Sequence, residues 1–63
     1  MMSDHELWAI ALKVEEKHGE ETPKHIATRI GGAAIAGDWA AVEMWRAVAN
    51  RYDLLHQDAR ARF

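Results

Sequence analysis

The sequence predicts an all-α protein, either a compact three-helix bundle or an orthogonal three-helix domain. Apolar residues recur at three- and four-residue spacing in three successive segments, which is typical of amphipathic helices. Start and stop signals separate these segments and place helices at about residues 4–18, 23–36 and 39–57. Because the intervening turns are short and no linker or repeat divides the chain, we expect residues 1–63 to form a single three-helix domain.

The first helix is predicted from a capping box, Ser3-Asp4-His5-Glu6. In such a box the serine side chain accepts from the backbone amide of Glu6, and the glutamate reaches back to the cap. Gly19 supplies a C-terminal stop. The apolar face of this helix contains Leu7, Ile10, Ala11, Val14 and His18.

The second helix is predicted to start at Thr22-Pro23, because threonine can cap a helix and proline at the first helical position loses no intrahelical hydrogen bond. Gly37 ends this helix and Asp38 caps the next one. The predicted inner face of the second helix contains Ile26, Ala27, Ile30, Ala33 and Ala34.

The third helix carries one long apolar stripe. Its end is expected to fray from Gln57 to Phe63. The stripe contains Ala41, Val42, Trp45, Val48, Ala49, Tyr52 and Leu55.

The glycine-rich stretch from Arg29 to Trp39 is not a phosphate-binding loop. It lacks the Gly-Lys-Ser/Thr ending of a P-loop, the spacing of a dinucleotide fingerprint, and a preceding strand. We expect Ala27, Gly31 and Ala34 to form a shallow strip against Trp8 or Trp45, so that Gly31→Leu destabilises the fold by about 1–3 kcal/mol through overpacking. Gly32 falls on the opposite side and leaves a bend or hinge open as an alternative.

Composition excludes several classes of function. The chain has no cysteine, which excludes disulfides, cysteine-based zinc motifs and a cysteine nucleophile. Eight Lys and Arg against ten Asp and Glu give a net charge of −2, which argues against a dedicated nucleic-acid binder. The sequence shows no secretory signal and no apolar run long enough to cross a membrane, so we expect a cytoplasmic protein.

Glu15 is the one acidic residue inside the apolar arc of the first helix. We expect it either to form a structural ion pair with Arg29 or Arg46 or to extend its carboxylate into solvent from the edge of the arc. His18 and His25 flank the first turn and, with Glu15, resemble a zinc site in ligand type. Their spacing matches no helical zinc signature. The sequence therefore predicts no catalytic residue, cofactor or metal site, and the protein is not expected to be an enzyme.

Binding of nucleic acid is the alternative function. The Ala27–Gly31 spacing resembles the turn of a helix-turn-helix motif, but the residues after it offer few groups for base edges. On the third helix Arg46, Asn50 and Arg51 are suitable residue types. Two acidic residues on the same surface, Glu43 and Asp53, would repel phosphates.

Three apolar residues, Ile35, Trp39 and Leu54, point away from the predicted core. Because small cores often gain stability through assembly, they predict binding to an unknown protein partner or to a second copy in a homodimer. The leading prediction is thus a small non-enzymatic protein-interaction module. The candidate interaction or structural positions are Trp8, Glu15, His18, Arg29, Trp39, Trp45, Arg46 and Leu54.

Four groups of residues together resemble a family of short helical proteins of alphaproteobacteria that is known only as a domain of unknown function. The resemblance covers residues 6–55 and implies no activity, cofactor or catalytic residue. Gly32 and Trp39 depart from the pattern. The groups are Glu6-Leu7-Trp8-Ala9, Glu15 with His18-Gly19, Pro23 with Ile26-Ala27 and Arg29-Ile30-Gly31, and Ala36-Gly37-Asp38 with Val42 and Trp45.

Overall fold

The computed structural model of the chain describes residues 2–61, and its side chains as far as Gln57. Helix α1 (Asp4–His18) leads through a short 3-10 turn, η1 (Gly19–Glu21), into α2 (Thr22–Ala36), and α3 (Trp39–Ala61) follows. Within residues 2–61 there is no strand. The predicted all-α class is therefore confirmed.

Helix α1 begins as its capping box predicts. The Ser3 side chain accepts a hydrogen bond from the Glu6 backbone amide at 3.2 Å. The return contact differs from the expected one, because the Ser3 hydroxyl also donates to the Glu6 carboxylate. One side chain thus satisfies an amide that has no intrahelical partner.

The connection between α1 and α2 is a helical corner rather than a loop. Gly19 ends α1 with a φ of 55°, and helical backbone continues through η1 into α2. Thr22 does not cap α2 as predicted, since the cap position is Glu21, which makes no side-chain bond there. Instead the buried Thr22 hydroxyl donates to the Gly19 carbonyl at 2.7 Å, which closes the corner.

The connection between α2 and α3 follows the predicted punctuation. Gly37 adopts the left-handed conformation, with a φ of 73°, and its amide and that of Asp38 bond back to the carbonyls of Ala34 and Ala33. This pair of bonds is the Schellman motif. The Asp38 carboxylate then accepts from the Ala41 amide at 3.1 Å and starts α3.

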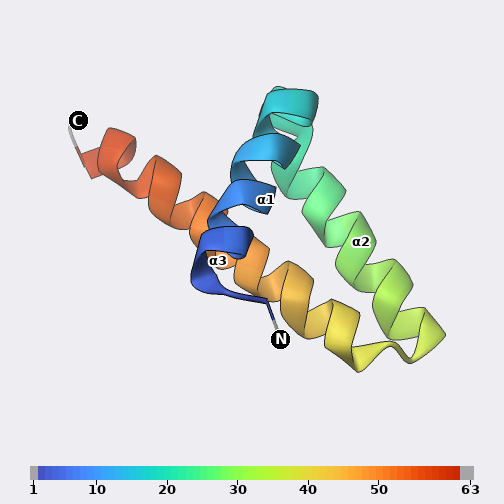
Figure 1. Cartoon of the computed structure of the whole chain (residues 1–63). Coiled ribbons are helices and arrows are strands. Elements are labelled where there is room, and N and C mark those ends of the chain that lie inside the picture. Colours follow the sequence, from blue (N-terminus) through green and yellow to red (C-terminus); the bar gives the residue numbers. More distant parts are fainter. Residues whose placement is uncertain (1, 62–63) are drawn as a thin grey trace.

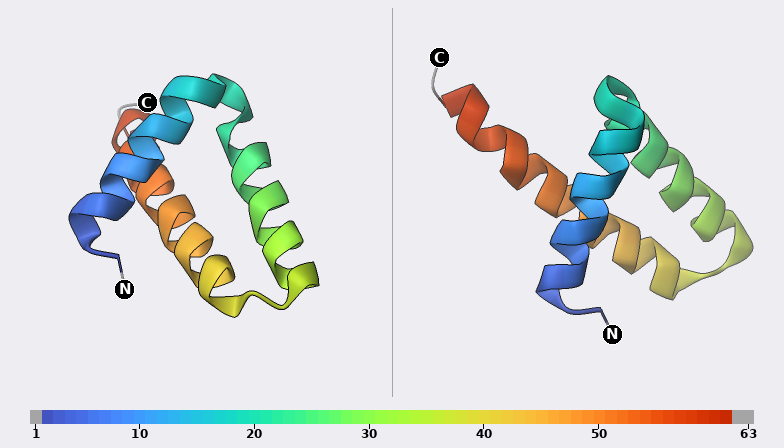
Figure 2. Two further views of the ribbon diagram at one scale, coloured as in Figure 1. Left: turned by 45° about the vertical axis from the view of Figure 1, so that its right-hand side comes forward. Right: turned by 45° about the horizontal axis from the view of Figure 1, so that its top comes forward.

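The predicted compact three-helix bundle is not confirmed. Between Asp4 and Ala36 the helical segments follow one another without a loop and are interrupted only by the backbone of Gly19, so α1 and α2 are two arms joined at a sharp corner. They pack mainly against α3 and make far fewer contacts with each other (Figures 1 and 2). The radius of gyration is 12.0 Å, against about 10.6 Å expected for a compact domain of this length.

The buried core lies where both arms meet α3. Around it pack partly buried residues such as Ile10, Val14, Ile30 and Trp45. Two members of the predicted inner face of α2, Ala27 and Ala34, are instead exposed. The central cluster consists of Leu7, Ala11, Ile26 and Val48.

Helix α3 is longer than predicted. Fraying was expected from Gln57, yet helical backbone continues to Ala61, and Figure 1 shows this end of α3 extending beyond the other helices. Residues 62–63 of the expected frayed segment lie outside the described residues.

Candidate functional site

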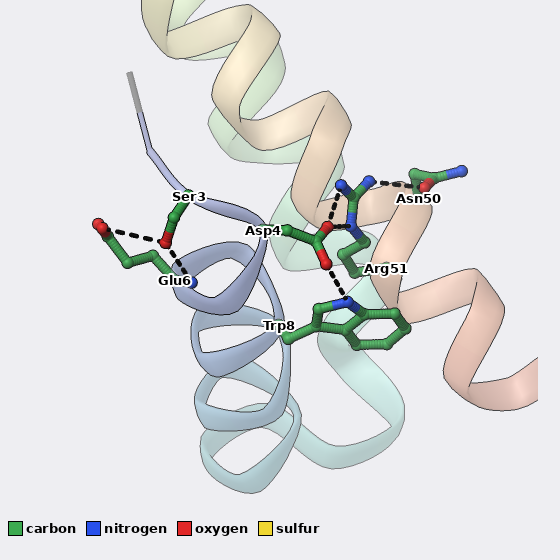
Figure 3. Close-up of polar contacts among 6 residues, drawn as sticks. All are labelled: Ser3, Asp4, Glu6, Trp8, Asn50 and Arg51. Atoms are coloured by element: carbon green, nitrogen blue, oxygen red, sulfur yellow. Dashed lines mark hydrogen bonds and ion pairs between the residues drawn. The ribbon is translucent and has the colours of Figure 1, made fainter.

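A polar cluster fastens the start of α1 to α3 (Figure 3). The Asp4 carboxylate accepts two bonds from the Arg51 guanidinium, at 2.9 and 2.5 Å, and one from the Trp8 indole at 3.0 Å. Arg51 also donates to the Asn50 side chain at 2.8 Å. Trp8 therefore has a structural role here, and the positive charge of Arg51 is already paired within the chain.

Glu15 pairs with His56 of α3, and not with Arg29 or Arg46 as predicted. The Glu15 Oε2 and His56 Nε2 atoms lie 2.5 Å apart, and both side chains are partly exposed. The His56 ring also leans on Tyr52, with ring centroids 4.4 Å apart. The sequence signal for this partner was the position of His56 one turn after Tyr52, at the edge of the apolar stripe of α3.

The rings of His18 and His25, which flank the corner between α1 and α2, stack with centroids 3.9 Å apart. The edge of Trp45 meets His25 at 6.0 Å. Burial in this cluster, and then the positive charges of His18, Arg29 and Lys17, lower the pKa of His25 below its ordinary value of 6.5. The three helices thus meet in an aromatic contact whose centre favours the neutral imidazole.

This cluster does not assemble a metal site from its predicted ligand types. His18 and His25 face each other as stacked planes, whereas Glu15 is engaged by His56. Among the described residues no group of three or more His, Asp or Glu side chains is placed to hold a metal ion.

The predicted strip of small residues on α2 does not pack against a tryptophan at Gly31. A Cβ atom added at Gly31 would meet nothing within 4 Å, so neither Trp8 nor Trp45 packs on it, and the overpacking expected for Gly31→Leu is wrong. Gly32, assigned to the outer side, lines an open groove between α2 and α3 instead. That groove is lined by His25, Thr28, Arg29, Gly32, Ala33, Ala41 and Trp45.

Two large apolar side chains are exposed close together in the sequence, where α2 ends and α3 begins. Ile35 is 92% exposed and Trp39 is 65% exposed. Between Ile30 and Val42 the only charged residue is Asp38, and its carboxylate caps α3. We call the exposed residues Ala34, Ile35, Ala36, Trp39 and Ala40 the hairpin tip.

The other predicted positions are scattered over the surface. Leu54 is 46% exposed on α3, far along the chain from the hairpin tip. Arg46 is exposed on α3, and Arg29 lines the groove between α2 and α3. No helix among the described residues is both long and apolar enough to span a membrane.

These features define a class of small all-helical proteins. Charged side chains of α1 and α3 pair with each other, while large apolar side chains such as Ile35 and Trp39 are exposed. The chain belongs to the DUF6961 family, described as a family of unknown function, whose model matches residues 3–60. Comparison with curated proteins and with solved structures finds no match. The predicted membership in a family of unknown function is confirmed, while the alphaproteobacterial origin stays a prediction.

Proposed function

We propose that the protein is a small non-enzymatic interaction module that binds another protein chain through the hairpin tip. The observation that supports this proposal is the exposure of Ile35 and Trp39 in a segment with a single charge. Isolated exposed apolar residues are ordinary on protein surfaces. Two large ones at the same end of a hairpin, surrounded by alanines, instead have the composition of an interaction site.

The interactions of the polar side chains support a binding role rather than catalysis. Asp4 and Arg51 are engaged with each other, as are Glu15 and His56. These two contacts join α1 to α3, so the carboxylates of Asp4 and Glu15 both stabilise the packing of these helices. A general acid or base needs a positioned partner group next to a substrate-sized cavity. The groove beside α2 is open, and the imidazole that lines it, His25, is stacked on His18.

The test uses a double variant that changes the tip without disturbing the helices. In Ile35→Lys/Trp39→Glu the new lysine lies at the C-terminal end of α2 and the new glutamate at the N-terminal end of α3, where each charge suits the helix dipole. The net charge is unchanged. We expect the tagged variant to lose proteins that the original chain captures from its source cells, as identified by mass spectrometry.

The matched control is Ala9→Glu/Leu12→Lys, which adds the same two charges at exposed apolar positions of α1 outside the tip. It should retain the captured partners. Equal capture by both double variants would reject the hairpin tip as the binding surface.

Nucleic-acid binding through Arg29, Arg46, Asn50 and Arg51 stays the alternative. The ion pair between Arg51 and Asp4 offsets one of the positive charges that this surface offers. A parallel capture after nuclease treatment separates the two functions, because partners held by nucleic acid are then lost. Direct binding that weakens steeply with salt would favour the alternative.

A further inference from the structure

A groove between the start of α1 and the first half of α3 brings apolar side chains of both helices to the surface. Its volume is about 660 Å³, and it is open to solvent. Leu7 belongs to the buried cluster, and Met44 and Ala47 pack against that cluster. We call it the methionine groove, and the apolar residues that line it are Met2, Leu7, Ala40, Met44 and Ala47.

The methionine groove is continuous with the hairpin tip. Ala40 belongs to both surfaces. Helical spacing also places Trp39, Glu43 and Ala47 in one row along α3. Because Trp39 is 65% exposed at the start of this row, a partner that contacts the tip can extend directly into the groove.

The two methionines give the groove an adaptable apolar wall. Met2 and Met44 are both partly buried and come from opposite sides of the groove. Methionine side chains are unbranched and flexible, so they pack against apolar side chains of varied shape. Such a wall suits the apolar face of a partner helix.

The charged side chains that line the groove are acidic. Glu6 reaches it from α1 and Glu43 from α3, and both are exposed. Within residues 2–57 neither forms an ion pair, and the Glu6 carboxylate accepts from the neutral Ser3 hydroxyl (Figure 3). No Lys, Arg or His stands among the described residues that line the groove. Two carboxylates beside an apolar wall favour a cationic partner and repel the phosphates of nucleic acid and of lipid.

We infer that the methionine groove binds a basic amphipathic helix of the partner protein. The apolar side chains of that helix pack on Met2 and Met44, and its Lys or Arg side chains pair with Glu6 and Glu43. Residues 2–61 contain no strand that offers an edge to an extended peptide, whereas a helix satisfies its own backbone hydrogen bonds. This inference rests on the proposed function and names the chemistry of the partner.

The probe is a synthetic helical peptide of about 15 residues that carries leucine on one face and lysine on the other. The full chain is titrated with it, and the methyl signals of isotope-labelled Met2 and Met44 are followed by NMR. We expect both signals to shift with this Leu/Lys peptide. A Leu/Glu peptide, with glutamate in place of every lysine, should leave them unmoved at the same concentrations, because Glu6 and Glu43 repel it.

The contribution of the two acids is measured with Glu6→Gln/Glu43→Gln. Glutamine at position 6 keeps the start of α1, since a capping box accepts either residue. This variant should bind the Leu/Lys peptide about three- to tenfold more weakly. The matched control, Glu16→Gln/Glu20→Gln, removes two exposed carboxylates outside the groove and should retain most of the affinity.

The position of the peptide is tested with a lysine in the groove itself. Ala40 is exposed and lines the groove, so Ala40→Lys both fills it and repels a basic helix. The methyl shifts should then be lost at peptide concentrations that saturate the original chain. Ala9→Lys adds the same charge at an exposed position of α1 outside the groove and should leave binding intact.

An unmoved Met44 signal, equal affinities of the two glutamine pairs, or equal binding of the Leu/Glu peptide would each overturn the basic partner. If the hairpin-tip double variant then still loses proteins captured from cells, the proposed function stands and only this inference fails. Peptide binding in the groove together with unchanged capture by that double variant would instead reject the tip and leave the groove as the binding surface.

Discussion

His25 is the residue whose surroundings most directly predict a response to pH. Its ring lies against His18 on α1 and Trp45 on α3, so all three helices contribute to the cluster. Because its pKa in the folded protein is lowered below 6.5, the unfolded chain binds the proton more readily. Above pH 6.5 both states are neutral at this site, and the residue adds no pH dependence.

We therefore expect stability to fall as the pH decreases from about 6.5 toward the lower pKa of folded His25, and to lose nothing further at this site below it. Urea unfolding across this pH range measures the slope. His25→Gln should reduce it, whereas the exposed His5→Gln should not. An unchanged slope in His25→Gln would show that the proton is taken up elsewhere.

Two glycines of the α2 segment, Gly32 inside the helix and Gly37 directly after it, differ in whether the backbone requires glycine. Gly37 has a φ of 73°, which only glycine adopts without strain. Gly32 has helical geometry, and an added Cβ would meet nothing within 4 Å. The same change to alanine should therefore have opposite effects at these positions.

Gly32→Ala should stabilise the protein by about 0.5–1 kcal/mol, because alanine loses less conformational freedom in a helix. Gly37→Ala should destabilise it by about 1–2 kcal/mol, because the left-handed conformation costs about that much for a residue with a Cβ. The midpoint of denaturant unfolding, compared with that of the original chain, measures the stability change in each of the two variants. Destabilisation by Gly32→Ala would indicate that the groove beside Trp45 is narrower than this structure has it.

The ends of the helices could be predicted from the sequence where the residues that determine them are close neighbours in the chain. Ser3 and the Gly37-Asp38 pair act within a few residues, and the helix ends that they predict are the observed ones. The inward face of α2 was predicted correctly at Ile26 and Ile30 but not at Ala27 and Ala34, because small residues carry little hydropathy and therefore do not indicate a side. The Glu15–His56 contact spans 41 residues and depends on how α1 crosses α3, which no local pattern specifies.

The whole molecule is organised around α3. Both other helices pack on it, and Val48 lies fully buried in the cluster that also contains Leu7 of α1 and Ile26 of α2. In a chain of 63 residues so small a core leaves little reserve of stability. Loss of packing at Val48 should therefore release α1 and α2 together rather than one at a time.

We expect Val48→Ala to lower the free energy of unfolding by about 1–3 kcal/mol, since it removes buried methyl groups and leaves a cavity. Amide hydrogen exchange should show protection falling in both α1 and α2. Leu12→Ala, at a leucine that is 53% exposed, should change stability by less than about 0.5 kcal/mol. Protection that falls in α2 but persists in α1 would contradict a shared core, because α1 would then be held by its polar contacts at Asp4 and Glu15 alone.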